Sequence, residues 1–230
     1  MSIDEELIKH LSQFITENKR QKIEDALRYR TNYLTVVLED IYQPHNASAV
    51  VRTCDCFGLQ QIHVIENKNS YKVNPDVTLG SSKWLDIIHH NKSVNNTRAC
   101  IEELKDSGYR IIATTPHKND TNLEDLPLDK KTALLFGTEA EGLSKEAIDM
   151  ADGFVKIPMY GFTESLNISV SAAICVHQLS MKLRSSDISW SLSDGEKNVI
   201  RLNWIRGIIN RPDLLEKDFF DNFQKGKDSQ

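Results

Sequence analysis

The sequence predicts an α/β fold, with a mostly parallel sheet, helices on both faces of that sheet, and further helices at both ends of the chain. Two observations lead to this prediction. Short apolar runs that are typical of buried strands, beginning with 34–38, alternate with segments of helical periodicity, and such alternation is typical of parallel sheets that are covered on both faces. The chain also has 230 residues, 40% of them hydrophobic, which is enough to bury the core of one principal domain.

The individual elements follow from local patterns. Apolar spacing predicts helices over 3–17 and 21–30. Further along, we expect strands at 34–38, 61–65, 84–88, 110–114, 133–136 and 154–157, and helices at 46–57, 95–106, 144–150 and from Asn167 to about 184. A linker at 185–195, a helix at 196–210 and a polar tail follow. These elements divide the chain into an N-terminal helical extension at 1–30, a central α/β domain at 31–185, and a C-terminal linker with a helical extension at 186–230.

Capping residues indicate where two of these helices begin. Asn46 is expected to be the N-cap of helix 46–57. This start places Arg52 about a turn and a half into the helix, away from its apolar face. Ser165 and Asn167 are both good capping residues, and we expect one of them to start the helix that ends near 184.

The composition argues against several classes of protein. The chain has no run of about 18 apolar residues, as a transmembrane helix requires, and its acidic start lacks the apolar stretch of a signal peptide. We therefore expect a cytoplasmic protein with no membrane partner. The four cysteines show neither a CxxC pair nor a matching histidine spacing, so we predict no metal site and no disulfide framework. Cys54 and Cys56 are expected to pack as small core residues.

The charge distribution bears on nucleic-acid partners. The net charge of −5 argues against a protein that coats nucleic acid, and no DNA partner is expected. Basic residues nevertheless gather near both ends of the chain beside Tyr29, Tyr33 and Trp204, a combination that is typical of RNA contacts. The predicted RNA-binding residues are Lys19, Arg20, Arg28, Arg30, Arg201 and Arg206. The alternative is that they form ordinary solvated helix faces.

Three loops are candidates for a ligand site, because open α/β sheets bind ligands at the carboxyl ends of their strands. They are 40–46, 137–144 and 158–167. The middle loop has a GxxxxG spacing, but Leu143 stands where a phosphate-binding loop needs lysine, and its two carboxylates disfavour a nucleoside triphosphate. Taken alone, this loop is equally consistent with a structural turn capped by Ser144, and Arg52 with an exposed arginine.

The stretch from Ile157 to Ala173, which contains the loop at 158–167, is the most informative part of the sequence. Pro158 cannot donate into a strand ladder and Gly161 tolerates unusual backbone angles, so the chain is expected to bend here. The helix that follows begins with small residues, which allow neighbouring backbone to approach closely. A loop of free N–H groups that leads into such a helix suits a small polar ligand.

Together, the three loops resemble one family. They carry ordered motifs that read Asn46-x5-Arg52 before Phe57-Gly58, then Gly137-x-Glu139-x2-Gly142-Leu143-Ser144, then Ile157-Pro158-Met159-x-Gly161-x4-Leu166-Asn167-Ile168-Ser169. This order is similar to that of the SPOUT-superfamily RNA 2′-O-ribose methyltransferases of the TrmH type, over about 33–184. Two segments most resemble the tRNA branch, which methylates guanosine 18 of the D-loop. They are Pro44-His45-Asn46, at the start of the predicted helix, and Gly80-Ser81-Ser82-Lys83-Trp84.

The resemblance implies properties that periodicity cannot show. It implies a SPOUT methyltransferase domain with a C-terminal deep trefoil knot, a homodimer, tRNA as partner and S-adenosylmethionine as cofactor. The residues implied to bind the cofactor are Thr115, Phe136, Gly137, Glu139, Gly142, Ile157, Met159, Ser165, Leu166 and Asn167. Those implied to be catalytic are Arg52, Asn46, Glu139, Ser165 and Asn167.

The chemistry constrains the role of Arg52. Methylation of a ribose 2′-hydroxyl requires an aligned displacement and removal of a proton from a weakly acidic alcohol. Because a guanidinium stays protonated in proteins, we expect Arg52 to stabilise the developing alkoxide and to contact the RNA phosphate. Asn46 is expected to orient Arg52 or the ribose, and Glu139 to position Arg52 or Asn46. The alternatives are methylation of ribosomal RNA or of another tRNA position, a catalytically silent RNA-binding homologue, and a generic nucleotide-binding protein.

Overall fold

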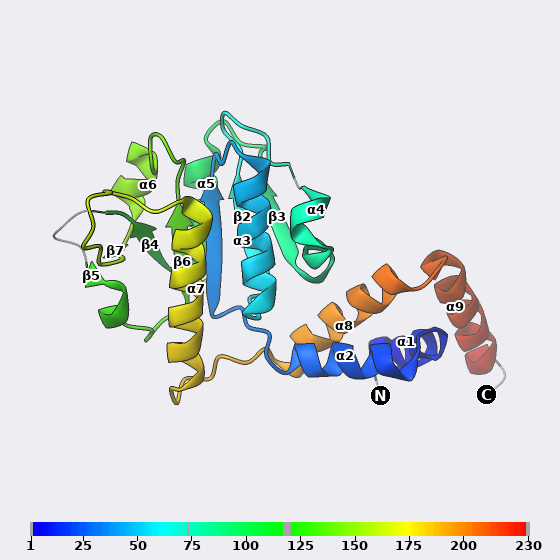
Figure 1. The fold of residues 1–230 in the computed structure, drawn as a ribbon. Coiled ribbons are helices and arrows are strands. Elements are labelled where there is room, and N and C mark those ends of the chain that lie inside the picture. The colour runs from blue at the N-terminus through cyan, green and yellow to red at the C-terminus, as the bar shows by residue number, and fades with distance from the viewer. Residues whose placement is uncertain (1, 73, 117–120, 229–230) are drawn as a thin grey trace. The chain divides into compact units, whose positions relative to one another are not determined.

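The computed structural model describes residues 2–72, 74–116 and 121–228, which group into two compact units (Figure 1). Thr31–Trp190 form an α/β unit, and the described residues of Met1–Arg30 and Ser191–Gln230 form a helical unit. In the described residues, no helix is both long enough and apolar enough to cross a membrane.

The α/β unit is built on one parallel sheet. Within the described residues it has seven strands in the order β3-β2-β1-β6-β4-β7-β5, and every pairing is parallel. The strands are β1 Leu34–Glu39, β2 Gln61–Ile65, β3 Asp86–His90, β4 Arg110–Thr114, β5 Thr121–Asn122, β6 Thr132–Phe136 and β7 Gly153–Lys156. The predicted α/β class with a parallel sheet is confirmed. Only the two-residue strand β5 has no counterpart in the sequence prediction, because so short a strand has no periodicity.

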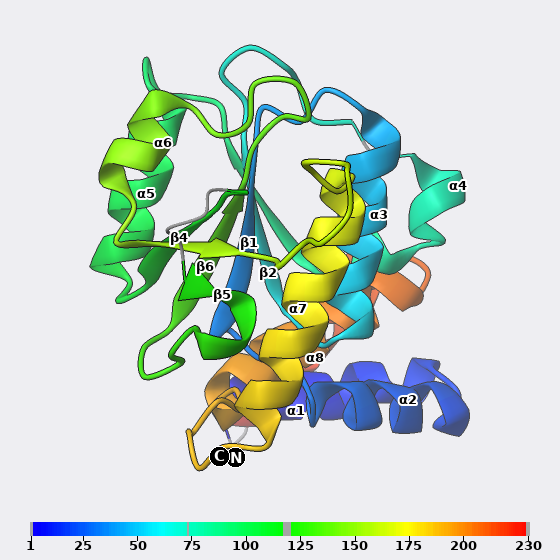
Figure 2. The ribbon, with the colours of Figure 1, turned by 60° about the vertical axis from the view of Figure 1, so that its left-hand side comes forward.

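Helices cover both faces of this sheet (Figures 1 and 2). Helices α3 (Pro44–Cys56) and α7 (Ile168–Arg184) pack side by side on one face, and α5 (Asn96–Asp106) and α6 (Lys145–Met150) pack together on the other. The alternation of a strand divides its side chains between the two faces. Val36 and Leu38 join the core under α3 and α7, whereas Val37 joins the core under α5.

Short helical segments complete the α/β unit. They are α4 (Pro75–Thr78) and the 3-10 turns at Ser81–Trp84 and Leu123–Asp125. The segments at 75–78 and 81–84 contact α3, and the turn at 123–125 contacts α7. None of them was predicted from the sequence, because a single helical turn carries too few residues for a periodic pattern.

The helical unit contains α1 (Ile3–Leu11), a 3-10 turn (Ser12–Phe14), α2 (Glu17–Leu27), α8 (Asp194–Ile208) and α9 (Pro212–Asp228). The predicted single helix over 3–17 is wrong, since Ile15 is extended and Thr16 caps α2 by accepting a hydrogen bond from the backbone of Lys19. Helix α2 therefore begins four residues before the predicted 21–30. Helix α9 occupies a stretch for which the sequence analysis predicted only a polar tail.

Two expectations about α3 are also corrected. Asn46 is not its N-cap: Gln43 occupies that position and Pro44 begins the helix, which suits proline because its missing N–H has no partner in a first helical turn. Asn46 therefore lies inside the first turn and is buried. Cys54 is buried as expected, but Cys56 is exposed, because positions two apart point to different sides of a helix.

Candidate active site

The loop after β6 is closed on itself by an unusually close backbone approach. A Cβ atom on Gly137 would lie 2.1 Å from the carbonyl carbon of Gly142, so only glycine fits at this position. Thr138 and Gly142 exchange two backbone hydrogen bonds of 2.9 and 3.0 Å. Gly142 has φ +71°, a conformation that favours glycine. Both glycines of the motif are therefore required by the shape of the loop.

The loop after β7 ends where α7 begins. Asn167 is the N-cap of α7, and its Oδ1 accepts a hydrogen bond of 2.9 Å from the backbone N–H of Ser169. This choice between the two expected caps leaves Ser165 free to line the neighbouring cavity. At the other loop, Ser144 caps α6 as expected.

A cavity of about 580 Å³ lies between these loops and the end of β4. All ten residues that the sequence analysis assigned to cofactor binding line it, and they come from three separate stretches: Thr115, Phe136, Gly137, Glu139, Gly142, Ile157, Met159, Ser165, Leu166 and Asn167. The cavity combines apolar side chains with backbone groups of the two loops. Its volume falls within the usual range for a small-molecule site, about 300–1,000 Å³.

Three of the predicted catalytic residues form a hydrogen-bonded network at the edge of this cavity. The Oε1 atom of Glu139 accepts hydrogen bonds from the Nδ2 atoms of Asn46, at 2.5 Å, and Asn167, at 2.9 Å. Asn167 Nδ2 also lies 3.3 Å from Asn46 Oδ1. One carboxylate oxygen therefore fixes two amides that come from the first turn of α3 and the cap of α7.

Arg52 and Ser165 are not part of this network. Arg52 is exposed on α3, six residues beyond Asn46 and hence about 9 Å further along the helix axis. Within the part of the chain that the structure describes, its side chain has no hydrogen bond or ion pair. Of the two roles expected of Glu139, the contact with Asn46 is observed, whereas in the described residues no hydrogen bond or ion pair joins Asn46 or Glu139 to Arg52.

A second cavity, of about 920 Å³, lies on the other side of the Glu139 loop. Asn46 and Glu139 line it together with 40–43 and 67–69. The residue that shapes this side, Asp40, was not predicted from the sequence. It has φ 52°, and its Oδ1 accepts hydrogen bonds of 2.7, 2.7 and 3.2 Å from three successive backbone N–H groups at 67–69. Its position directly after β1 was the available signal.

Glu39 is a second missed residue. Its side chain is buried, and it accepts hydrogen bonds from Thr97 Oγ1 at 2.6 Å, Ser144 Oγ at 2.7 Å and the Ser144 backbone N–H at 2.8 Å. It therefore ties the end of β1 to the starts of α5 and α6. We infer that Glu39 holds the far end of the Gly137–Ser144 loop in place.

The predicted RNA-binding residues all lie in the helical unit, and most of them have intramolecular partners. The ion pairs are Arg20 with Glu17 at 3.1 Å, Arg28 with Asp25 at 3.4 Å, Arg201 with Glu24 at 2.6 Å, and Arg206 with Glu216 at 2.6 Å. Arg30 is buried, with its guanidinium 5.0 Å from the ring centre of Trp204. Lys19 is exposed and has no ion-pair partner among the described residues.

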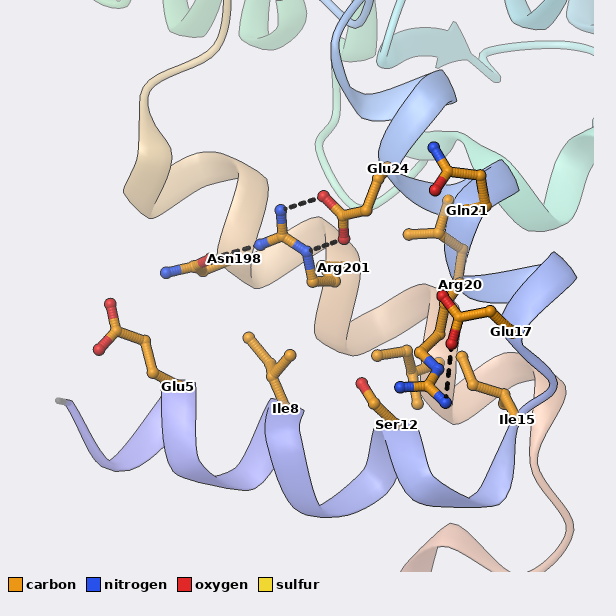
Figure 3. Close-up of a pocket in the computed structure, with 12 residues that line it drawn as sticks. Glu5, Ile8, Ser12, Ile15, Glu17, Arg20, Gln21, Glu24, Asn198 and Arg201 are labelled. Atoms are coloured by element: carbon orange, nitrogen blue, oxygen red, sulfur yellow. Dashed lines mark hydrogen bonds and ion pairs between the residues drawn. The ribbon is translucent and has the colours of Figure 1, made fainter.

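Figure 3 shows the cavity around two of these arginines, which has a volume of about 350 Å³. Arg201 points toward Glu24 and Asn198 and donates to both. The Glu24 carboxylate accepts hydrogen bonds from the Nε and from one terminal nitrogen of that guanidinium, at 2.6 and 2.8 Å. Such a two-pronged contact joins α2 to α8 and occupies the donors that a phosphate would use.

Comparison with known proteins gives a consistent result. The family model described as the SpoU rRNA Methylase family matches residues 33–177. The tRNA (guanosine(18)-2′-O)-methyltransferase of Borreliella burgdorferi is 48% identical over 217 residues, which cover 93% of this chain and 98% of that protein. The solved structure of the Aquifex aeolicus TrmH/SpoU tRNA modifying enzyme superposes with a TM-score of 0.75 at 31% identity, covering 84% of this chain and 98% of that one. The SpoU methyltransferase AviRb of Streptomyces viridochromogenes, solved in complex with AdoMet, shares the fold at 24% identity, with a TM-score of 0.60 over 70% of this chain and 65% of that one.

Proposed function

The chain belongs to the SpoU rRNA methylase family, and we propose that it transfers a methyl group from S-adenosylmethionine to a ribose 2′-hydroxyl of tRNA, at guanosine 18 of the D-loop. One observation carries the proposal: the cavity between the two motif loops borders the network of Asn46, Glu139 and Asn167. The choice of tRNA over ribosomal RNA is supported by relatives that are named for guanosine 18 and match most of the chain.

The cavity of about 580 Å³ fits the cofactor in its chemistry as well as its size. Apolar side chains such as Met159 and Leu166 suit the less polar parts of S-adenosylmethionine, and the free backbone groups of the loops suit its polar edges. Gly137 keeps the loop closed where any Cβ would force it open. When bound, S-adenosylmethionine supplies the electrophilic methyl group.

The residues of this chain supply orientation and charge. The Glu139 carboxylate fixes the amides of Asn46 and Asn167, which leaves those groups positioned at the boundary between the two cavities. Arg52 projects from α3, the helix that carries Asn46 in its first turn, and has no intramolecular partner among the described residues. We propose that its guanidinium contacts the RNA phosphate and stabilises the 2′-alkoxide, while phosphate or water accepts the proton.

We also propose the assembly that the resemblance implies. A homodimer is supported by large exposed apolar side chains on the 158–167 loop and on α7, where Tyr160, Phe162 and Met181 are 97%, 105% and 54% exposed. Burial of such a surface against a second copy would remove it from water. The trefoil knot would be formed by the stretch from Ile157 through α7. Light scattering on the purified chain tests the dimer, and a monomer at micromolar concentration would contradict it.

The deciding experiment is methyl transfer from labelled S-adenosylmethionine to unmodified tRNA and to ribosomal RNA, followed by mapping of the methylated ribose. A single 2′-O-methyl group at guanosine 18 of tRNA is the expected result. Transfer to another ribose would support the proposed methyltransferase activity but show that the target is a different nucleotide. Failure to transfer to either RNA and to bind the cofactor would favour a silent RNA-binding protein.

Arg52→Lys tests the mechanism separately. Lysine keeps the charge but not the planar pair of donors, so we expect single-turnover transfer to fall by about a hundredfold or more, as for loss of an oxyanion donor. Cys56→Ser is the matched control, since Cys56 is exposed one turn further along the same helix. A near-normal rate for Arg52→Lys would exclude this role.

A further inference from the structure

A cluster of three metal-ligating side chains is buried in the α/β unit, and none of the three lines either of the two cavities at the candidate active site. His63 on β2, His90 on β3 and Cys100 on α5 are 3%, 8% and 0% exposed. One ligand atom from each lies within 4.8 Å of the other two. The cluster has no part in the proposed methyl transfer.

The fold assembles this cluster from distant positions. His63 pairs with Ile88 and Ile65 pairs with His90 in the parallel register of β2 and β3, so both histidines project from the same face of the sheet. Helix α5 packs on that face and brings Cys100 over them. No metal site was predicted from the sequence, because the cysteines show no close metal-binding spacing and these three residues come from three separate elements.

The hydrogen bond between the two histidines leaves one of their buried ring nitrogens without a partner among the described residues. His63 Nδ1 lies 3.0 Å from His90 Nε2, so one ring donates to the other. The second nitrogen of His63, Nε2, is buried and has no hydrogen-bond partner among the described residues. A buried polar atom without a partner is costly, and a bound ion is one arrangement that would satisfy it.

We propose that His63, His90 and Cys100 bind one zinc ion, with a water molecule as the fourth ligand. Two imidazoles and a thiolate are ligands that Zn²⁺ prefers, in a tetrahedral site with bonds of about 2.0–2.3 Å. Ligand atoms in such a site are about 3.3–3.7 Å apart. Side-chain rotations of about an ångström therefore convert the present spacing, with its 4.8 Å limit, into that geometry.

The charges around the cluster favour a cation. Burial lowers the pKa of His63 to about 4 and lowers the pKa of His90, which favours the neutral form of each ring. Burial, with the nearby carboxylates of Glu103 and Glu39, raises the pKa of the Cys100 thiol. The carboxylates that disfavour a bare thiolate attract a dication, and metal binding would release the thiol proton to solvent.

Glu103 also lies where an outer-shell carboxylate is found in zinc sites. Its Oε2 is 3.8 Å from His90 Nδ1, the ring nitrogen that faces away from His63. Carboxylates in this position orient a zinc-bound imidazole and raise its basicity. The ion would join β2, β3 and α5 and stabilise the fold without a redox role.

The test uses the full chain without an affinity tag, stripped with a chelator and then titrated with Zn²⁺ or Co²⁺ alone. We expect one zinc per chain after dialysis, a higher melting temperature, and a cobalt spectrum with a thiolate charge-transfer band. Zinc well below one per chain, or a cobalt spectrum without that band, would overturn the proposal. These measurements on the wild-type chain decide the matter even if a variant fails to fold.

Three variants sharpen the test. Cys100→Ser should lose the charge-transfer band, while Cys175→Ser should keep it, since Cys175 is an equally buried thiol in α7. Glu103→Gln, at an exposed position, should weaken zinc binding by about tenfold. A wild-type spectrum for Cys100→Ser would show that the metal is bound elsewhere, and unchanged affinity for Glu103→Gln would exclude its outer-shell role.

Discussion

Gly137 offers the sharpest test of the proposed cofactor site, because the cost of a side chain there can be worked out from the structure. In Gly137→Ala the new Cβ would lie 2.1 Å from the carbonyl carbon and oxygen of Gly142, whereas real Cβ contacts are essentially never under 3.0 Å. The loop must therefore open by at least 0.9 Å, the difference between 3.0 and 2.1 Å. Because the obstacle is backbone, no side-chain rotation can relieve the clash.

Opening the loop has a calculable effect on cofactor binding. It breaks the two backbone hydrogen bonds between Thr138 and Gly142, which are 2.9 and 3.0 Å long. At about 0.5–1.5 kcal/mol each, their loss costs about 1–3 kcal/mol. If the closed loop is the form that binds, the Kd for S-adenosylmethionine rises by about 5- to 150-fold.

Two other glycines of the same loops provide matched controls. Gly161→Ala meets no atom within 4 Å and has an ordinary φ, so its Kd should match the wild type. Gly142→Ala meets no atom within 4 Å but has φ +71°, so it should cost about 1 kcal/mol through backbone strain alone. Calorimetric titration with S-adenosylmethionine measures all three, with thermal unfolding as a check on folding. A wild-type Kd for Gly137→Ala, or an equal loss in all three variants, would refute the reasoning.

Four further predictions follow from other contacts. Glu139→Ala removes the shared acceptor of two amides, and at about 1 kcal/mol per bond the single-turnover rate of methyl transfer should fall about 30-fold. The rate of Glu139→Gln, which keeps an acceptor oxygen, should fall less, and equal rates for the two variants would exclude the positioning role. Asp40→Ala leaves three backbone N–H groups without an acceptor and should lower the free energy of unfolding, measured in urea, by about 3 kcal/mol. Asp40→Asn keeps an acceptor and tolerates positive φ, so it should lower the free energy of unfolding by only about 1 kcal/mol. Arg201→Lys should lower the melting temperature and leave the Kd for tRNA unchanged, because Glu24 already occupies its guanidinium; weaker tRNA binding at an unchanged melting temperature would make Arg201 an RNA contact instead. The Kd for tRNA should also rise with salt concentration, as expected of phosphate contacts from a confined basic patch, and a salt-independent Kd would contradict such a patch.

Local backbone chemistry explains why the two loops of the proposed cofactor site could be recognised in the sequence. The shape of the Gly137–Gly142 loop depends on two glycines five positions apart, and the start of α7 depends on a single capping side chain, Asn167. Features of this kind depend on residues that lie close together in the sequence. The start of α3 was predicted incorrectly by a few residues, because Pro44 at the first helical position outweighed the capping preference of Asn46.

Interactions between distant residues could not be predicted in this way. Asp40 and Glu39 are ordinary acidic residues in the sequence, and their roles appear only when the loop at 67–69 and the starts of α5 and α6 reach them. His63 and Cys100 likewise meet only because α5 packs on β2 and β3. Their partners lie dozens of positions away, so no spacing rule identifies them.

The basic residues at the chain ends show the same limit with a functional consequence. Arg201 and Glu24 are 177 positions apart, yet they form a two-pronged ion pair that leaves few donors for RNA. A cluster of arginines in a sequence therefore shows only that guanidinium groups are present. The carboxylates that pair with them in the folded protein determine how many of them can bind phosphate. In this chain, exposed cations without a carboxylate partner in the described residues, such as Lys19 in the helical unit and Arg52 on α3, are the stronger candidates for tRNA contacts. An RNA-binding surface mapped to Arg201 and Arg206 rather than to such residues would require these ion pairs to open on binding.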